Sequence, residues 1–232
     1  MQIFAYKNNL LFGLSLKALQ STLIFAEREI FMRIISGKAK GVQLSALSSK
    51  KTRPILDRAK ESMFSILGDS ILDSVVLDLF AGTGSLGIEA LSRGAKRCLF
   101  VENSTNAIKV IKKNLQNANL LKRTVVLKIN AFRLLDFIKN KDIKFDIIIV
   151  APPYKLLDIG CGDRKRIFSL MEAFVSKQII SENGIIVLQH HIKQKIVQEC
   201  FKQLNIIDER QYSNTQLTFL KGNVAATKPE ES

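Results

Sequence analysis

A glycine-rich segment, "LDLFAGTGSLGIEAL" at residues 77–91, constrains the fold more than any other part of the sequence. Its glycines, Gly82, Gly84 and Gly87, have the G-x-G-x-x-G spacing, and the segment lies between a predicted strand and a predicted helix. Such a loop follows the carboxyl end of a strand in an open α/β sheet, where the backbone can approach a ligand closely. The spacing alone fits NAD, FAD or S-adenosylmethionine.

An acidic residue at the first strand end helps to separate these ligands. Asp78 stands four residues before the first glycine, where a carboxylate would repel a pyrophosphate but can pair with the α-ammonium group of S-adenosylmethionine. Glu102, at the end of the next predicted strand, suits two ribose hydroxyls, although a dinucleotide would use it in the same way. Asn130, after the third strand, fits either an adenine edge or a helix N-cap, and the two roles are compatible. We therefore predict S-adenosylmethionine as the cofactor.

Strands and helices alternate along the rest of the chain. This alternation predicts an α/β fold with a doubly wound, mostly parallel, Rossmann-like sheet of seven strands that is covered on both faces. The last two strands, residues 205–212 and 214–222, are expected to form an antiparallel pair. The other predicted strands are residues 75–80, 96–102, 124–130, 145–150 and 184–189, and the predicted helices are residues 85–94, 104–120, 131–140, about 165–176 and about 193–204.

The fourth strand ends on Ala-Pro-Pro-Tyr, beside the glycine-rich loop. Prolines have no backbone N–H to give, so they cannot continue a ladder, and they leave rigid carbonyl groups at the strand end. The ring of Tyr154 can stack on a planar base, whose exocyclic amino group would then face these carbonyls. A corner that merely ends the strand is the alternative. We predict that this segment aligns a nucleobase amino group with the methyl group of the cofactor. The predicted catalytic residues are Ala151, Pro152, Pro153 and Tyr154.

The charge balance indicates a polyanionic partner. The chain has 35 Lys and Arg residues against 21 Asp and Glu residues, a formal net charge of +14, which fits nucleic acid first and a membrane surface second. Its three cysteines have no short spacing, and His190 and His191 are neighbours that would point to opposite faces of a strand. We therefore expect no disulfide framework, no metal site and a reducing cytoplasm.

The segment ahead of the glycine-rich loop predicts a basic appendage. "RIISGKAKGVQL" alternates around a turn and is typical of a β-hairpin with Lys38 and Lys40 at its tip, and a helix follows from about Ile55. Arg53 and Arg58 lie just before and within this helix. These four cations are the candidate contacts to RNA phosphates, although a solvated face would explain the same charges.

Several of these motifs together resemble one family. From about residue 32 to 220 the chain resembles the RsmD-type bacterial 16S rRNA guanine-N2 methyltransferases, which are class I S-adenosylmethionine-dependent enzymes. The resemblance rests on "RIISGKAKG", "RPILDRAKESMFSIL", "LDLFAGTGSLGIEALSRGA", "VEN" and "PPY", in that order, and on "YSNTQLTFL" near the end. It implies methyl transfer to the exocyclic N2 of a guanine in 16S rRNA, with 16S rRNA or the small ribosomal subunit particle as partner, and the protein is expected to be a monomer. The cofactor contacts that it implies are Asp78, Phe80, Gly82, Gly84, Glu102, Asn130 and Ala131.

These observations divide the chain into four parts. Residues 1–31 are an N-terminal extension, which either comes from a wrongly chosen start codon or forms a short amphipathic helix. Charged and polar residues interrupt its apolar stretch, so it lacks the roughly 18–20 uninterrupted apolar residues of a membrane-spanning helix. The basic appendage spans residues 32–70 and the methyltransferase domain residues 71–222, and residues 223–232 are expected to be a disordered tail.

Ala151 departs from the family pattern, in which Asp, or elsewhere Asn or Ser, precedes Pro-Pro and accepts a hydrogen from the target amino group. Losing that bond would cost about 1–3 kcal/mol, or roughly 10- to 100-fold in rate. Three interpretations of the alanine are open. Backbone carbonyl groups suffice, or Asp158 or Asp163 takes over, or the chain binds rRNA and cofactor but catalyses weakly.

Other function classes fit the sequence less well. The nearer rivals transfer a methyl group to another nucleobase amino group, such as adenine N6 in RNA or DNA, or to a small molecule or protein. A dehydrogenase would need a proton donor, and the strand ends offer neither a His nor a Tyr–Lys arrangement. A purely RNA-binding factor would explain the charge but not the glycine-rich loop.

Overall fold

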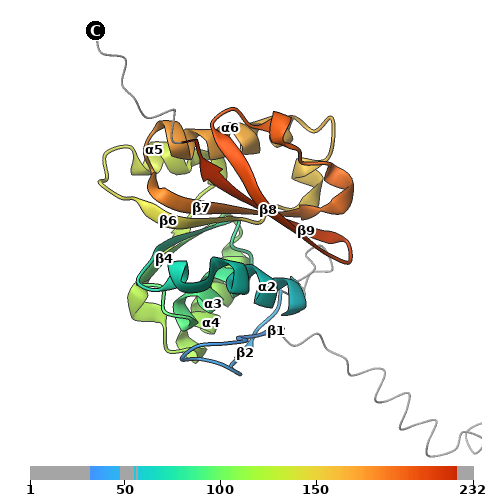
Figure 1. Cartoon of the computed structure of the whole chain (residues 1–232). Coiled ribbons are helices and arrows are strands. Elements are labelled where there is room, and N and C mark those ends of the chain that lie inside the picture. Colours follow the sequence, from blue (N-terminus) through green and yellow to red (C-terminus); the bar gives the residue numbers. More distant parts are fainter. Residues whose placement is uncertain (1–31, 48–54, 56, 224–232) are drawn as a thin grey trace, which may run out of the picture. The chain divides into compact units, whose positions relative to one another are not determined.

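A seven-stranded sheet lies at the centre of the computed structural model, which describes residues 32–47, 55 and 57–223 (Figure 1). Its strand order is β5-β4-β3-β6-β7-β9-β8, with β9 antiparallel to both neighbours and all other pairs parallel. The predicted mostly parallel sheet is confirmed. Its strands are β3 (Val75–Leu79), β4 (Arg97–Glu102), β5 (Thr124–Lys128), β6 (Phe145–Val150), β7 (Ile180–His191), β8 (Leu204–Tyr212) and β9 (Thr215–Gly222).

The strand order reverses between β3 and β6. From β3 the chain moves outward to β4 and β5, and it then returns to place β6 on the other side of β3. The loops after β3 and β6 therefore diverge from adjacent strand ends, which is the position where open α/β sheets bind ligands. One of these loops is the glycine-rich loop and the other is the Pro-Pro-Tyr segment.

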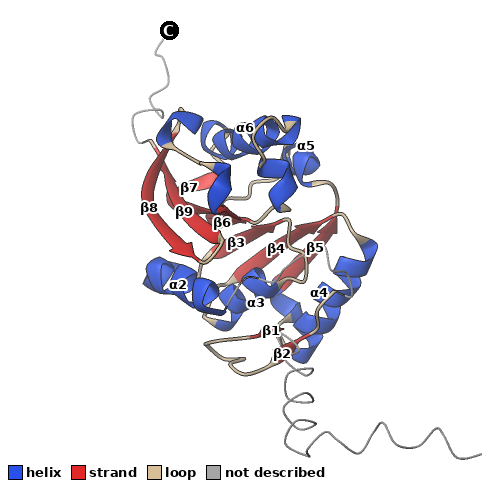
Figure 2. Cartoon of the chain, turned by 90° about the vertical axis from the view of Figure 1, so that its right-hand side faces the viewer, coloured by secondary structure: helices blue, strands red, loops and turns tan. Residues whose placement is uncertain are grey.

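Helices cover both faces of the sheet, as predicted for a doubly wound fold (Figures 1 and 2). On one face lie α2 (Asp57–Leu67), α3 (Ser85–Ser92) and α4 (Thr105–Asn117), and on the other lie α5 (Leu134–Ile138) and α6 (Gly162–Ser176). The predicted helix at residues 131–140 is thus shorter than expected. In the described part of the chain, six 3-10 turns complete the connections: η1 (Gly68–Ile71), η2 (Leu121–Arg123), η3 (Ala131–Arg133), η4 (Tyr154–Leu157), η5 (Ile192–Gln194) and η6 (Gln198–Cys200).

The central strand β6 shows why its sequence is a continuous apolar run. Ile147 and Ile149 point into the cluster beneath α3, whereas Ile148 and Val150 point into the cluster beneath α6. Side chains alternate along a strand, so a strand covered on both faces needs apolar residues at every position. All four side chains are fully buried.

The predicted β-hairpin is confirmed by the antiparallel pair β1 (Met32–Arg33) and β2 (Gln43–Leu44). Its loop docks on the end of α3, where Lys38 N donates to Ser92 O at 2.8 Å. A Cβ at Gly37, whose φ is +84°, would lie 1.9 Å from that oxygen, so only glycine fits this approach. The Lys38 side chain remains exposed.

A buried carboxylate joins the hairpin to the helices. Glu89 in α3 is 0% exposed and accepts from Ile35 N at 2.8 Å, from Ser36 N at 3.0 Å and from Arg93 Nε at 2.8 Å. Lys60 of α2 lies 3.5 Å away and also donates to the backbone of the hairpin. Burial lowers the pKa of Lys60, and the charge of Glu89 opposes this shift. Glu89 thus holds the hairpin, α2 and α3 together through paired groups that are buried or half-buried.

The predicted helix from about Lys193 to Leu204 is wrong. The segment contains the two short turns η5 and η6 and then enters β8. Lys195 between the turns has a φ of 44°, in the left-handed region that a right-handed helix never uses. The Gln198 side chain donates to Leu204 O and accepts from Ile206 N, and such bonds to the backbone compete with helix formation.

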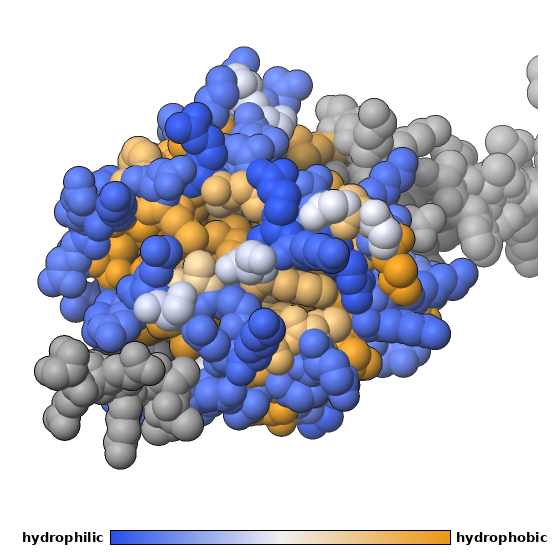
Figure 3. Space-filling model, turned by 90° about the horizontal axis from the view of Figure 1, so that it is seen from above, coloured by the Kyte–Doolittle hydropathy of each residue, from blue (hydrophilic) through white to orange (hydrophobic). Residues whose placement is uncertain are grey.

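Part of the sequence-based organisation lies outside the described residues. This holds for the predicted extension at 1–31 and for the predicted tail beyond residue 223. None of the helices in the described part of the chain is long and apolar enough to cross a membrane. Figure 3 views the molecule from the side that α5 and α6 cover, where hydrophilic side chains surround smaller hydrophobic areas.

Candidate active site

The glycine-rich loop turns sharply between β3 and α3. Phe80, Gly82 and Gly84 all have positive φ angles, of 64°, 57° and 78°. Phe80 is strained in this region because it has a side chain, and its ring packs edge-on against Phe132 with 6.1 Å between the ring centroids. A Cβ built at Gly82 would have no neighbour closer than 4.0 Å. The loop therefore leaves open space beside its backbone.

The Asp78 carboxylate binds a backbone amide in the first turn of α3. Its Oδ2 accepts from Gly87 N at 2.9 Å, and this approach requires glycine because a Cβ there would lie 2.4 Å from the Phe100 ring. Asp78 is 1% exposed, and this burial raises the pKa of its carboxyl to about 7, with a smaller rise from the charge of Glu102 and an opposing effect of the Gly87 bond. The predicted pairing of Asp78 with an α-ammonium group stays a prediction.

Glu102 joins the loops that follow β3 and β4. Its Oε2 accepts from Gly82 N at 2.9 Å, and its Oε1 accepts from Asn103 N at 2.9 Å and Ser104 N at 2.8 Å. The side chain is half-buried. A carboxylate in this position is accessible from the sheet edge and is oriented by three backbone amides.

Asn130 and Ala131 stand at the end of β5. Asn130 is exposed, and its Oδ1 accepts from Phe132 N at 3.0 Å as the N-cap of η3, which confirms the N-cap reading. Ala131 is buried. Both residues therefore lie at the same sheet edge as the glycine-rich loop.

The Pro-Pro-Tyr segment is held next to that loop. Ala151 N donates to Leu79 O at 3.3 Å, which ties the end of β6 to the end of β3. Pro152 is buried, and Pro153 is exposed. The hydroxyl of Tyr154 lies 2.9 Å from Thr215 Oγ1, and its ring packs edge-on against His191 with 5.5 Å between centroids. Contacts from β7 and β9 thus orient the aromatic ring.

The two acids suggested as substitutes for a carboxylate at position 151 are already engaged. Asp158 Oδ1 accepts from Gln194 Nε2 at 3.0 Å, and Asp163 Oδ1 pairs with Arg166 at 2.6 Å. Either acid would have to leave its partner to reach a target amino group. The geometry therefore favours the readings in which neither acid replaces the missing side chain.

Asn114 borders the glycine-rich loop, and the sequence patterns above did not single it out. Buried in α4, it donates to Thr83 O at 3.0 Å in the glycine-rich loop and accepts from Ser45 N at 2.7 Å in the basic appendage. A signal was present, since Asn114 shares the buried face of its helix with Ala107 and Ile111. A polar residue on an apolar helix face indicates a buried partner.

The candidate RNA contacts occupy different regions. Lys38 and Lys40 are exposed at the end of α3 that lies away from the glycine-rich loop. Arg58 is exposed one turn before Ser62, which bonds the Tyr212 hydroxyl at the end of β8, close in sequence to Thr215. Arg53 lies outside the described residues. Asp57, which precedes Arg58, pairs with Arg33 of the hairpin at 3.3 Å, so the start of α2 lies beside the appendage.

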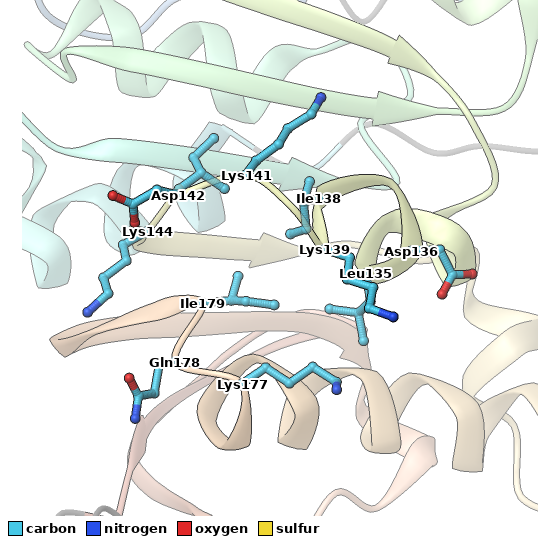
Figure 4. Close-up of a pocket in the computed structure, with 11 residues that line it drawn as sticks. Leu135, Asp136, Ile138, Lys139, Lys141, Asp142, Lys144, Lys177, Gln178 and Ile179 are labelled. Atoms are coloured by element: carbon cyan, nitrogen blue, oxygen red, sulfur yellow. The ribbon is translucent and has the colours of Figure 1, made fainter.

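A separate cavity of about 510 Å³ lies at the opposite edge of the sheet (Figure 4). It lies at the amino ends of β6 and β7, and its lining includes Lys139, Lys144, Lys177 and Ile179. The amino ends of parallel strands face away from the ligand edge, so this cavity is no part of the cofactor site. Among the described residues no group of three or more His, Cys, Asp or Glu side chains is placed to hold a metal ion.

Comparison with known proteins agrees with this geometry. The model of the family described as "Conserved hypothetical protein 95" matches residues 32–221. The chain belongs to this family. The Conserved hypothetical protein 95 match begins at the first strand of the hairpin and ends in β9, so it includes the basic appendage as well as the sheet.

Several proteins similar to this chain are named as methyltransferases. The chain is 38% identical to "Putative rRNA methyltransferase YlbH" of Bacillus subtilis (strain 168), over 68% of this chain and 82% of that protein. It is 33% identical to "Ribosomal RNA small subunit methyltransferase D" of Buchnera aphidicola subsp. Acyrthosiphon pisum (strain APS), over 71% and 80%. A solved structure named "Putative methyltransferase yhhF from Escherichia coli" superposes with a TM-score of 0.68 at 24% identity, over 83% and 98%, which shows a shared fold.

Proposed function

We propose that this protein transfers a methyl group from S-adenosylmethionine to the exocyclic N2 amino group of a guanine in 16S rRNA. The proposal is carried by the bond from Ala151 N to Leu79 O, because it holds the Pro-Pro-Tyr segment beside the glycine-rich loop. Family membership and the relatives named as rRNA methyltransferases support the substrate class.

The residues at the ends of β3, β4 and β5 fit S-adenosylmethionine. The open space at Gly82 and the turn from Phe80 to Gly84 allow close backbone approach, and the half-buried Glu102 carboxylate suits the ribose hydroxyls. Asp78 would face the α-ammonium group, and Asn130 with Ala131 would border the adenine. When bound, S-adenosylmethionine supplies a methyl group activated by its sulfonium, so the protein's main task is alignment.

The Pro-Pro-Tyr segment aligns the target base in this proposal. Tyr154 provides the stacking surface, and the backbone carbonyls beside Pro152 and Pro153 accept hydrogens from the amino group. Ala151 provides no side-chain acceptor, so catalysis depends on carbonyl dipoles whose direction is fixed before the base arrives. The contacts of Tyr154 with Thr215 and His191 support such a fixed direction.

The partner in this proposal is 16S rRNA or a small-subunit particle. Its phosphates are bound by the exposed cations Lys38, Lys40 and Arg58 and by Arg53, and the net charge of +14 supports a polyanionic partner. The protein acts as a monomer in the cytoplasm without a metal. Residues 32–70 form its RNA-binding appendage and residues 71–222 its catalytic domain.

Methyl transfer to RNA from a strain that lacks the gene tests this function. Purified protein is incubated with labelled S-adenosylmethionine and either free 16S rRNA or small-subunit particles, and digested nucleosides are analysed by mass spectrometry. N2-methylguanosine is the expected product. N6-methyladenosine, or no RNA methylation while S-adenosylmethionine still binds, would contradict the proposal.

A pair of aromatic variants links this activity to the site. Tyr154→Ala is expected to remove most of the transfer, because the stacking surface is lost. Phe137→Ala is the matched control, since it removes an exposed ring of α5 that lies outside the Pro-Pro-Tyr segment. It should retain activity.

A further inference from the structure

The chain that follows Pro153 is held by a buried side chain from a distant segment. Gln194, 3% exposed, lies just beyond β7, and its Nε2 donates to Tyr154 O and, at 3.0 Å, to Asp158 Oδ1. Its Oε1 accepts from His191 N at 2.9 Å. The Gln194 amide therefore holds both ends of the η4 turn, and it bonds through its nitrogen as well as its oxygen.

Arg164 fixes the same two segments from the first turn of α6. Its Nη1 donates to Leu157 O at 2.6 Å and to Gln194 O at 2.7 Å, and its Nη2 donates to Lys195 O at 3.0 Å. The guanidinium also lies over the Phe168 ring, 5.0 Å from its centroid. Its planar fork of donors can serve three carbonyls together, which a lysine ammonium on a flexible stem cannot reproduce.

We infer that Gln194 and Arg164 are positioning residues, which hold the Pro-Pro-Tyr segment in the conformation that receives the target base. They donate to the backbone carbonyls of Tyr154 and Leu157 and to the Asp158 carboxylate, and within the described residues neither bonds the glycine-rich loop. Their action is therefore on the base and not on the cofactor. The inference rests on the proposed function.

Gln194 and Arg164, called the clamp below, matter more for orienting the target base because residue 151 is an alanine. Without a side-chain acceptor, orientation of the base must come from the Tyr154 ring and from backbone carbonyls. Such orientation persists only when the supporting residues are themselves locked by hydrogen bonds. Displacing the reacting groups by about 1 Å can cost about 100-fold in rate.

Variants of the clamp and a matched control test the inference. Gln194→Ala removes the amide, Gln194→Met removes it while keeping the volume, and Arg164→Lys removes the fork. The control is Gln198→Ala. Gln198 lies in the same connection after β7 and bonds the backbone at Leu204 O and at Ile206 N, each at 2.8 Å, but it does not bond the Pro-Pro-Tyr segment. Each protein is measured for methyl transfer to 16S rRNA and small-subunit particles, for S-adenosylmethionine affinity by calorimetry and for amide hydrogen exchange at residues 154–158.

The expected pattern separates positioning from general damage. The clamp variants should lower kcat by about tenfold or more and raise exchange at residues 154–158, with S-adenosylmethionine affinity within about twofold of wild type. Gln198→Ala should change none of these. Faster exchange with unchanged kcat, or an equal loss of kcat and cofactor affinity, would overturn the inference while an active wild type upholds the proposed function. A wild type that methylates neither RNA would overturn both.

Discussion

The Glu102 carboxylate and the Gly82 amide are joined by a 2.9 Å hydrogen bond across the ends of β4 and β3. Two further amides bind the other oxygen of the same carboxylate, so Glu102 orients the loops after both strands before any ligand is present. A carboxylate has about four acceptor sites, and it can keep such bonds while it also receives a ribose hydroxyl. The glycine-rich loop and the predicted ribose site are therefore coupled through one side chain.

Replacing this carboxylate should weaken cofactor binding. Glu102→Gln places an amide donor opposite backbone N–H groups, so at least one of these groups loses its acceptor. We expect S-adenosylmethionine affinity to fall about tenfold or more, corresponding to about 1.4 kcal/mol or more, as measured by calorimetry. Glu182→Gln, an exposed change at the start of β7, is the control. Equal affinities for the two variants would contradict the role of Glu102.

Restoring an acid at position 151 should have a small effect on the rate. The transferred methyl group is already activated and the carbonyl groups are held in place, so we expect Ala151→Asp to change kcat by less than about tenfold. Ala151→Asn, which has the same shape without the charge, is measured beside it on the same RNA. A gain approaching 100-fold would show instead that the natural alanine weakens this enzyme.

Asp78 should make folding stability depend on pH. Its folded pKa of about 7 lies above the ordinary value of 3.8, so the folded protein binds a proton that the unfolded chain has lost. The stability that this group contributes is present below about pH 4 and is lost as pH rises through about 7. Relative to wild type, Asp78→Asn should therefore become more stable as pH rises from 5 to 8, by up to about 1.4 kcal/mol per unit of pKa difference.

Denaturant unfolding of both proteins across this pH range measures the difference. His190 acts in the opposite sense, because burial lowers its pKa to about 4, so the stability it contributes is lost as pH falls from about 6.5 toward 4. Both proteins contain His190, and its contribution cancels in the difference. Parallel stability curves for Asp78→Asn and wild type would exclude a titrating Asp78.

Breaking the buried cluster around Glu89 should destabilise the whole domain. Glu89→Ala leaves Lys60, 2% exposed, without its carboxylate and removes the acceptor for Ile35 N and Ser36 N. We expect the free energy of unfolding to fall by about 3–5 kcal/mol in denaturant titrations.

Two further variants identify the cause of this loss. Glu61→Ala, an exposed change on α2, should alter stability by less than about 0.5 kcal/mol. Adding Lys60→Met to Glu89→Ala should recover part of the loss, because no unpaired charge then remains buried. A double variant no more stable than Glu89→Ala alone would mean that the lost amide bonds, and not the lysine, account for the effect.

The sheet could be predicted because its pattern is local. A strand buried on both faces needs an apolar run, as in β6. Gly82 and Gly84 predict a turn, because residues with side chains rarely adopt the positive φ angles that it requires. The predicted helix after β7 failed for the opposite reason. Its apolar periodicity is helical, but tertiary contacts of Gln194 and the left-handed Lys195 outweigh that tendency.

The order of strands and helices, the glycine-rich loop and the strand that ends on two prolines are encoded by residues that are neighbours along the chain, and the positive charge follows from composition alone. The fold adds the contacts between distant residues: Glu102 binds the Gly82 amide, Glu89 joins the hairpin to α2, and Gln194 holds Tyr154. These partners lie 20 to 54 residues apart, and no local propensity selects one buried polar partner over another. Packing makes that selection, because a buried polar group is stable only where its partner comes within hydrogen-bonding distance.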